Sequence, residues 1–470
     1  MGIRRTLLAS VFLGLSVVAG CGGGSTGTST VGTTPPSSTT ALNLSLRDMP
    51  PAGTNILSFS ATVTGAVMQP GNVSVLNAPM TVEMTQLQSM AAYLSTVNVP
   101  AGNYTGMTVT FSNPRMTFLN NSGAMMMNFN CPQGQICQIT PPMTTAGATI
   151  SGAPFPLNVV SGTPMSLVMD FDLMDSMQSN MSVSPMMSSF LQQPNAGSGG
   201  SGPVFGGMQG MIGVVNAVNA GNQSFTVQFA QGAPILTVMT GGATVFEGFD
   251  SIGKPNNFSS LAPGQTVEMA VQLTGAGALQ ASTVQLESGS GQELYGMIVG
   301  VNSTSGWCDV VVMNQAPVFS GVNIGDEIQV NLHAGTQFGM DNWGMDTGGM
   351  NFAGFSDMMP GQVVGFAPLS GLTPGTPPQV NVNQMRLMSA WVTGTISQVL
   401  SSTDFVLTPA SGIFSATGST SLHIVTSSGT AFDGVTGMSG LSVGNTVSLR
   451  GPLFTNGGNP TFFATYVLKR

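Results

Sequence analysis

The sequence predicts an all-β protein, in which an N-terminal antiparallel β-sandwich is followed by three tandem small β-barrel repeats. Three observations support this prediction. Glycine (63 residues) and proline (29 residues) are frequent, and both favour the tight turns that join short strands. Apolar and polar residues alternate in short stretches, which is typical of half-buried strands. A set of sequence markers also recurs three times in the same order, as expected of repeated domains.

The first twenty residues have the features of an export signal. Arg4 and Arg5 precede an apolar segment, residues 6–18, that is too short to span a bilayer stably. The segment runs into the letters VAGC, which end at Cys21 and resemble the lipobox of bacterial lipoproteins. This resemblance implies a signal peptide over residues 1–20 and acylation of Cys21, for example with palmitate. The alternative is an ordinary signal peptide behind which the cysteine is incidental.

Residues 21–40 are rich in Gly, Ser and Thr and cannot bury a core, so they predict a flexible tether. The residue after Cys21 is Gly22 and not Asp. By resemblance to the sorting rule of Gram-negative lipoproteins, this implies the outer membrane. We therefore expect an exported protein that is anchored to the outer membrane through lipid on Cys21, with its body facing the periplasm or displayed at the cell surface.

Residues 41–187 show the alternation expected of a β-sandwich, as in ILSFSATVTGAVM from residue 56. The stretches LSLRDMP from residue 44, VPAGNY from residue 99 and LVMDFD from residue 167 together resemble an uncharacterised domain family of bacterial lipoproteins. The resemblance supports a β-sandwich and a surface location. It implies no activity, because the function of that family is itself unknown.

Residues 188–204 are rich in Gly and Ser and predict a linker before repeat 1 (205–290), repeat 2 (291–389) and repeat 3 (390–470). Each repeat contains a glycine-led strand, a Thr-x-Phe step, a Gly-x-x-Val turn and a closing strand. The markers begin at Gly210, Gly296 and Gly394, then at Thr244, Thr336 and Thr430, and then at Gly264, Gly361 and Gly444.

This repeated unit is similar to a second uncharacterised bacterial family, whose members are expected to form small OB-like or SH3-like barrels. Closure into a barrel would leave few strand edges exposed. OB-type barrels can hold oligosaccharides or nucleic acid, but fold resemblance alone does not transfer a function.

The charge content argues against several functions. Charged residues make up 6% of the chain, with only nine Lys and Arg residues, so no basic patch is available for phosphates and we expect no nucleic-acid partner. Carbohydrate or another surface protein is the better candidate. The two histidines, His333 and His423, lie far apart in sequence, which leaves no local zinc pair and few options for a histidine relay.

The cysteines suit an oxidising compartment. Cys131 and Cys137 flank the turn-forming residues Pro-Gln-Gly-Gln, which predicts a local disulfide, with two buried free thiols as the alternative. Cys308 lies in a strand-like stretch. It is interpreted as a small buried hydrophobe in preference to a reactive thiol.

A first candidate cation site is the pattern D-x-D-x-x-D formed by Asp170, Asp172 and Asp175. On a strand the first two carboxylates share a face, as oxygen ligands of Ca²⁺ would. The pattern lacks the glycine and the terminal glutamate of an EF-hand loop. The alternative is that these residues solvate a strand edge or cap a turn.

A second candidate site lies in residues 338–355, where glycine recurs every five residues between Thr336 and Gly361. The interval is longer than its counterparts in the other repeats, which predicts an elaborated loop. Its residues Asp341, Trp343 and Asp346 offer carboxylates and a stacking face for Ca²⁺ or a sugar. The alternative is a flexible glycine-rich loop that its Phe and Met residues pin in place.

Methionine is also frequent, at 33 residues, with clusters at 125–127, 186–187 and 358–359. Thioethers can bind Cu(I) in an oxidising compartment, which suggests a periplasmic copper-binding or buffering protein as an alternative function. Methionine also serves as a pliant core filler, and its spread through every domain favours that interpretation.

No catalytic motif emerges from the sequence. The pattern GxSxG occurs at residues 23–27 and 440–444, but no histidine follows Ser442, and Gly444 leads into a predicted strand and not a helix. We therefore expect no enzyme activity and no cofactor beyond Ca²⁺. The expected function is a binding, adhesion or scaffold module, and the catalytic alternative is an anchored polysaccharide-processing protein.

Overall fold

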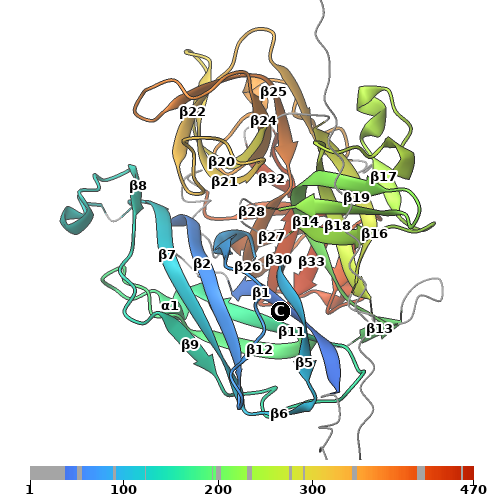
Figure 1. Cartoon of the computed structure of the whole chain (residues 1–470). Helices are drawn as coiled ribbons and strands as arrows, with labels where there is room; N and C mark the ends of the chain where they lie inside the picture. The colour runs from blue at the N-terminus through green and yellow to red at the C-terminus, as the bar shows by residue number, and fades with distance from the viewer. Residues whose placement is uncertain are drawn as a thin grey trace, which may run out of the picture. The chain divides into compact units, whose positions relative to one another are not determined.

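A computed structural model of the chain describes the following residues, to which all structural statements refer: 38–49, 55–87, 91–121, 123–192, 194–196, 203–229, 235–274, 278–288, 292–340, 347–409, 419–456 and 459–470. The structure confirms the all-β prediction (Figure 1), with α1 (Leu173–Ser176) a single helical turn at the end of a strand. Within these residues, none of the helices has the length and apolar character needed to cross a membrane.

The N-terminal domain is a β-sandwich whose two layers are visible in Figure 1. Its first sheet has the strand order β12-β11-β1-β5. One strand pair departs from the predicted antiparallel arrangement, because β1 and β11 run parallel. The strands are far apart in sequence, so no hairpin constrains their direction. Their bounds are β1 (Thr39–Met49), β5 (Ala92–Pro100), β11 (Met165–Asp172) and β12 (Met187–Gln192).

The second sheet is centred on the long pair β2 and β7. Aromatic rings close the space between the layers: Phe171 of β11 stacks on Phe59 of β2 at 6.1 Å and meets the edge of Phe111 of β7 at 5.4 Å. The remaining elements of this domain are β2 (Ile56–Gln69), β3 (Val73–Ser74), β4 (Met80–Glu83), η1 (Met84–Gln86), β6 (Gly102–Tyr104), β7 (Gly106–Leu119), η2 (Met127–Phe129), β8 (Ile136–Ile139), β9 (Gly147–Ile150) and β10 (Leu157–Val159).

The predicted linker, residues 188–204, is partly strand. β12 pairs along its length with β11, and β13 (Pro194–Ala196) pairs with the start of β14 (Pro203–Asn219). Phe190 explains why β12 stays on the sheet, because its ring lies 4.4 Å from the guanidinium carbon of Arg47. The sandwich therefore extends past residue 187.

Each of the three repeats closes into the same ring of strands. In repeat 1 the ring runs β14-β15-β16-β19-β18 and returns to β14; β16 and β19 are parallel, and β17 pairs with the far part of β19. Repeat 2 reproduces these pairings strand for strand. Repeat 3 has the same ring, with each of its last two strands divided into two. Ring closure pairs the strand edges that an open sheet would expose.

The elements of repeat 1 are β15 (Ser224–Gln228), β16 (Leu236–Met239), β17 (Val245–Glu247), η4 (Phe249–Ile252), η5 (Phe258–Ser260), β18 (Thr266–Thr274) and β19 (Leu279–Ser288). Those of repeat 2 are β20 (Glu293–Asn302), β21 (Trp307–Ala316), β22 (Glu327–Asn331), β23 (Gln337–Met340), η6 (Phe355–Asp357), β24 (Val363–Pro368) and β25 (Gln379–Met388).

Repeat 3 splits its last hairpin into two paired halves, β30 with β33 and β31 with β32. Its elements are β26 (Ala390–Val399), β27 (Asp404–Pro409), β28 (Leu422–Val425), β29 (Ala431–Asp433), η7 (Met438–Gly440), β30 (Thr446–Gly451), β31 (Leu453–Asn456), β32 (Asn459–Phe463) and β33 (Tyr466–Lys469).

The glycine-led strand marker has a packing role, and one of its predicted positions is wrong. Gly296 pairs with Val364 and Gly394 with Val447, and the residue of repeat 1 in this register is Gly213, opposite Val267, and not Gly210. A Cβ on Gly394 would lie 2.3 Å from the carbonyl oxygen of Thr408. The first strand therefore passes its neighbour at a distance that only glycine permits.

The Thr-x-Phe marker also has a structural role. The hydroxyl of Thr430 accepts from the N–H of Ser427 at 2.9 Å and donates to the carbonyl of Ala464 at 2.7 Å. Thr244 makes the equivalent pair of hydrogen bonds in repeat 1, and Thr336 does so in repeat 2. Each threonine thus ties a turn to the closing strand of its barrel.

The hydrophobic cores cross the boundaries of the repeats. Phe454 and Phe463 of repeat 3 are buried in the core of repeat 2, together with Val310 and Phe366. Leu57 of the N-terminal domain is buried in the core of repeat 3. The modules therefore share hydrophobic cores and are not independently packed domains.

Candidate functional site

Several predicted site residues lie outside the described residues: Cys21, Asp341, Trp343 and Asp346. Residues 338–340 of the predicted loop belong to β23, and residues 347–355 lie between β23 and β24. Phe338 and Phe352 meet edge to face at 5.5 Å, and Phe352 is buried in the core of repeat 2. Asp357 accepts the N–H groups of Ala353 and Gly354. These contacts show how Phe side chains hold both ends of the loop.

Asp170, Asp172 and Asp175 do not form a cation site in the described structure. Asp170 pairs with Arg47 at 2.9 Å, and the carboxylate of Asp172 accepts the backbone N–H of Asp175 at the start of α1. No three carboxylate, cysteine or histidine side chains converge as metal ligands among the described residues. Asp172 caps the turn, as the alternative interpretation expected, whereas Asp170 is buried in an ion pair.

The three cysteines within the described residues adopt the arrangement expected from the sequence. Cys131 and Cys137 form a disulfide. Asn120 holds the loop next to it by donating to the carbonyls of Ala124 and Cys131. Cys308 is a buried free thiol, and burial raises its pKa, which makes it unsuited to nucleophilic attack.

Neither histidine is part of a catalytic relay in the described structure. His423 Nε2 lies 3.8 Å from Asp404, but the hydroxyl of Ser401 donates to the carboxylate of Asp404 and not to the imidazole. A serine nucleophile needs its hydroxyl on the base, so this order of contacts cannot activate Ser401. His333 accepts the N–H of Gly335 within a turn.

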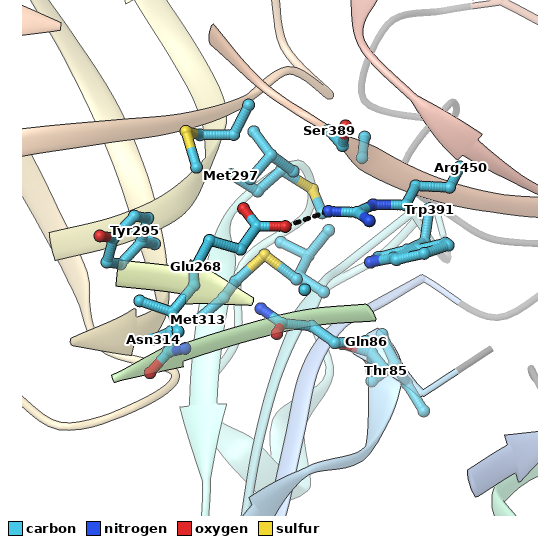
Figure 2. Close-up of a pocket in the computed structure, with 17 residues that line it drawn as sticks. Thr85, Gln86, Glu268, Tyr295, Met297, Met313, Asn314, Ser389, Trp391 and Arg450 are labelled. Carbon is cyan, nitrogen blue, oxygen red and sulfur yellow. Dashed lines mark hydrogen bonds and ion pairs between the residues drawn. The ribbon is translucent and has the colours of Figure 1, made fainter. Parts of the chain in front are cut away.

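Buried ion pairs join the repeats. Arg450 of β30 pairs with Glu268 of β18, across repeats 3 and 1, and its guanidinium lies over the ring of Trp391 at 5.1 Å (Figure 2). Arg386 of β25 pairs with Glu287 of β19, at 2.8 Å, and with Glu293 of β20. Sequence analysis missed these pairs because partners on separate strands leave no local pattern.

The Arg386 pairs create an unusual electrostatic setting. Burial raises the pKa of the Glu293 carboxyl, although the charge of Arg386 opposes that shift. The nearby Tyr295 is fully buried, and burial together with the charges of Glu293 and Glu287 raises its pKa well above its usual value. Tyr295 is therefore a neutral phenol at physiological pH.

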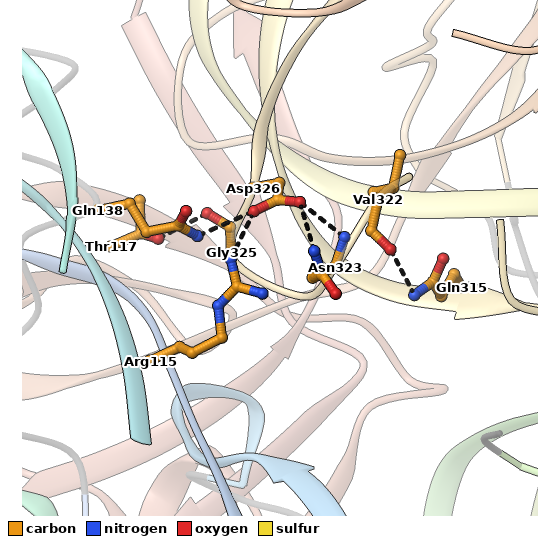
Figure 3. Close-up of polar contacts among 8 residues, drawn as sticks. All are labelled: Arg115, Thr117, Gln138, Gln315, Val322, Asn323, Gly325 and Asp326. Carbon is orange, nitrogen blue, oxygen red and sulfur yellow. Dashed lines mark hydrogen bonds and ion pairs between the residues drawn. The ribbon is translucent and has the colours of Figure 1, made fainter. Parts of the chain in front are cut away.

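A partly buried polar cluster joins the N-terminal domain to repeat 2 (Figure 3). One carboxylate oxygen of Asp326 accepts from Arg115 at 2.8 Å and from Gln138 at 3.1 Å. Thr117 donates to the carbonyl of Gly325 at 2.6 Å. The strands β7 and β8 thus dock on the turn that precedes β22.

A cavity of about 70 Å³ lies where the N-terminal domain meets all three repeats (Figure 2). The ion pair of Arg450 and Glu268 forms one wall. The other walls are mostly apolar and include three methionines from repeat 2, Met297, Met313 and Met388.

A second cavity of about 140 Å³ adjoins the first, and we call it the slot. It is bounded by β4, η1 and the start of β5 from the N-terminal domain, by β14 to β16 from repeat 1, and by β21 from repeat 2. Its walls are apolar and aromatic, with Tyr93 and Phe229 among them. Thr81, Asn314 and Ile324 are shared with a polar groove beyond it.

Comparison with known families finds matches to two separate segments of the chain. Residues 212–285 match a domain of unknown function (DUF5666), which covers most of repeat 1. Residues 39–185 match another domain of unknown function (DUF4382), which coincides with the β-sandwich. No curated protein matches the chain. Two parts of the chain thus match uncharacterised domain families, one over the sandwich and one over most of the first barrel.

Proposed function

We propose that this chain is an exported lipoprotein, anchored through Cys21 to the outer membrane, whose folded part is a non-catalytic binding, adhesion or scaffold module. The observation that carries the non-catalytic part is the use of the scarce charged residues. Arg47, Arg115, Arg386 and Arg450 are all engaged in ion pairs that join strands or domains. These four arginines therefore stabilise contacts within the protein, and their charges are paired there.

Lipidation of Cys21 has a direct test. Cys21→Ser removes the thiol that would be acylated, so the protein is expected to leave the membrane fraction and appear in the soluble fraction. Cys308→Ser is the matched control, because that thiol is buried in repeat 2, and its product should stay with the membranes. Membrane retention of Cys21→Ser would contradict the anchor.

We also infer that the repeats are OB-like. The closed ring β14-β15-β16-β19-β18, with its parallel closing pair, supports this inference. Barrels of this type present their loops and one face to ligands, including oligosaccharides. Carbohydrate or a surface protein is therefore the proposed partner class.

Binding and turnover can be separated with the same purified protein. A glycan array reports binding, and a hydrolysis screen on the same sugars reports turnover. The proposal expects binding without turnover. Release of reducing ends that scales with protein concentration would favour the polysaccharide-processing alternative.

Copper buffering is the second candidate, and one observation favours it. Met297, Met313 and Met388 line a single cavity, and thioethers are ligands for Cu(I). Titration with Cu(I) under a competing chelator tests this candidate. A dissociation constant for Cu(I) weaker than micromolar would contradict the copper-buffering function. Tighter binding that is lost in Met313→Leu would support it.

A further inference from the structure

The slot has the size and lining of a site for one apolar ring. Its volume, about 140 Å³, is close to that of an engineered apolar cavity of about 150 Å³ that binds benzene. Met80, Met211 and Met313 place thioether groups in its lining. Methionine side chains adapt to flat ligands and make favourable contacts with aromatic rings.

The slot favours an uncharged ligand. Its acidic residue, Glu83, is almost completely buried and already accepts hydrogen bonds from Ser58, Phe59 and Thr85. The hydroxyl of Tyr93 shares a hydrogen bond with the hydroxyl of Thr96, and the phenol is uncharged. Among the described residues, no lysine or arginine lines the slot, so a charged ligand would lose its hydrating water there without gaining an ion-pair partner.

A polar groove of about 280 Å³ adjoins the slot along β2, β4 and the loop before β22. Ser60, Thr62 and Thr81 contribute hydroxyls to it, and Asn113 and Asn314 contribute carboxamides. Arg115 also lines it, but its charge is paired with Asp326. Hydroxyl and carboxamide groups suit neutral polar substituents of a ligand.

We propose that the slot and the groove form one binding site for a neutral small molecule with a single aromatic ring. The ring occupies the slot, and hydroxyl or amide substituents occupy the groove. The inference deepens the proposed binding function and rests on it. Domain interfaces are common places for such sites, and here the walls come from three different modules.

The test uses the Cys21→Ser protein, which the proposed function expects in the soluble fraction, in detergent-free buffer with two probes, toluene and phenyl β-glucoside. Ligand-observed NMR should show saturable binding of toluene with a dissociation constant on the order of 1 mM or tighter. Phenyl β-glucoside should bind several-fold more tightly, because its hydroxyls reach the groove. Absence of saturable toluene binding would overturn the proposal.

Slot-filling variants locate the binding. Ala91→Phe places a ring in the slot and should weaken toluene binding at least tenfold, whereas Ala353→Phe, at an exposed alanine of repeat 2, should leave it within twofold. Leu236→Trp fills the slot from repeat 1 and replaces Ala91→Phe if that variant does not fold. Undiminished binding in a folded slot-filled variant would refute the site.

A groove variant separates the two halves of the site. Thr62→Val removes one hydroxyl with little change of shape, so toluene affinity should stay the same and phenyl β-glucoside affinity should fall several-fold. Equal loss for both probes would contradict the division into slot and groove. If toluene does not bind but sugars bind at another site, the inference about the slot and groove is overturned and the proposed binding function is kept. If the protein hydrolyses a polysaccharide, the proposed non-catalytic function is overturned and the inference about the slot and groove is kept.

Discussion

At the scale of single residues, the protein buries the carboxyl group of Glu83 among hydrogen-bond donors of its own chain. Glu83 lies at the end of β4 and caps η1 through the backbone N–H of Thr85. It also accepts from the hydroxyl of Ser58 at 2.7 Å and from the N–H of Phe59 at 3.1 Å. Burial outweighs these hydrogen bonds and raises the pKa of Glu83 to about 7.

This raised pKa predicts a pH-dependent stability. The folded state holds a proton on Glu83 that the unfolded state releases near pH 4.5, so the contribution is complete below pH 4.5 and is lost as the pH rises through about 7. The loss is about 3 kcal/mol of unfolding free energy. Urea denaturation at pH 5 and pH 8 measures it, and Glu83→Gln should reduce the difference between the two values by that amount.

Glu247 provides the control, because its carboxyl lies in β17 and is only partly buried. Glu247→Gln should leave most of the difference between pH 5 and pH 8 in place. An unchanged pH dependence in Glu83→Gln would show that the buried carboxyl is not the group responsible.

At the scale of elements, each barrel depends on glycine where its first strand passes the second. Gly296 pairs within the ring as Gly394 does, and an added Cβ would lie 2.5 Å from the carbonyl oxygen of Val311. The turn glycines are a separate requirement, since Gly264, Gly361 and Gly444 all have φ near +90°. Strand crossing and turn entry thus explain two of the four repeated markers.

Gly394→Ala is expected to destabilise repeat 3 by about 3 kcal/mol, because the methyl group meets the backbone of β27 and cannot be accommodated by a rotamer change. Thermal unfolding measures the loss. The control is Gly354→Ala, where an added Cβ has nothing within 4 Å and φ is −174°. An unchanged unfolding free energy in Gly394→Ala would contradict this prediction, because it would mean that β26 and β27 move apart without loss of stability.

At the scale of the whole molecule, contacts between modules hold the described structure together. Repeat 3 contributes Phe454 to the core of repeat 2 and pairs Arg450 with Glu268 of repeat 1. The N-terminal domain docks on repeat 2 through Arg115 and Asp326. Arg450 and Glu268 form one wall of the cavity beside the slot, and the walls of the slot come from three modules, so the proposed binding site depends on the assembly of the modules.

Removal of Arg450 is expected to be severe. Arg450→Ala leaves the buried carboxylate of Glu268 without its ion pair, and loss of one partner of a buried pair costs about 3 to 5 kcal/mol. The double variant Arg450→Met with Glu268→Met should recover most of that stability. Arg115→Ala removes a pair that is about one-third exposed, so it should cost less than about 1 kcal/mol.

Denaturant unfolding of the unsubstituted protein and of the three variants measures these differences in unfolding free energy. A similar cost for Arg450→Ala and Arg115→Ala would contradict the assignment of the Arg450 pair as a buried clamp between repeats.

Local features of the sequence were sufficient for the fold class, the threefold repetition and the disulfide between Cys131 and Cys137. Alternation, turn residues and short loops act over a few positions, so they can be interpreted without knowing which strands pair. The same reasoning placed the repeat 1 glycine at Gly210, three residues from Gly213, because register depends on the partner strand and not on the strand itself.

Only the tertiary structure decided which groups meet. Arg450 and Glu268 are 182 residues apart, and Arg115 and Asp326 are 211 apart, so nothing in either local sequence indicates the other. The slot is likewise absent from any single segment, because its walls come from three modules. The sequence by itself determined the units of this protein, and the packing of those units decided where its charges are neutralised and where a ligand can enter.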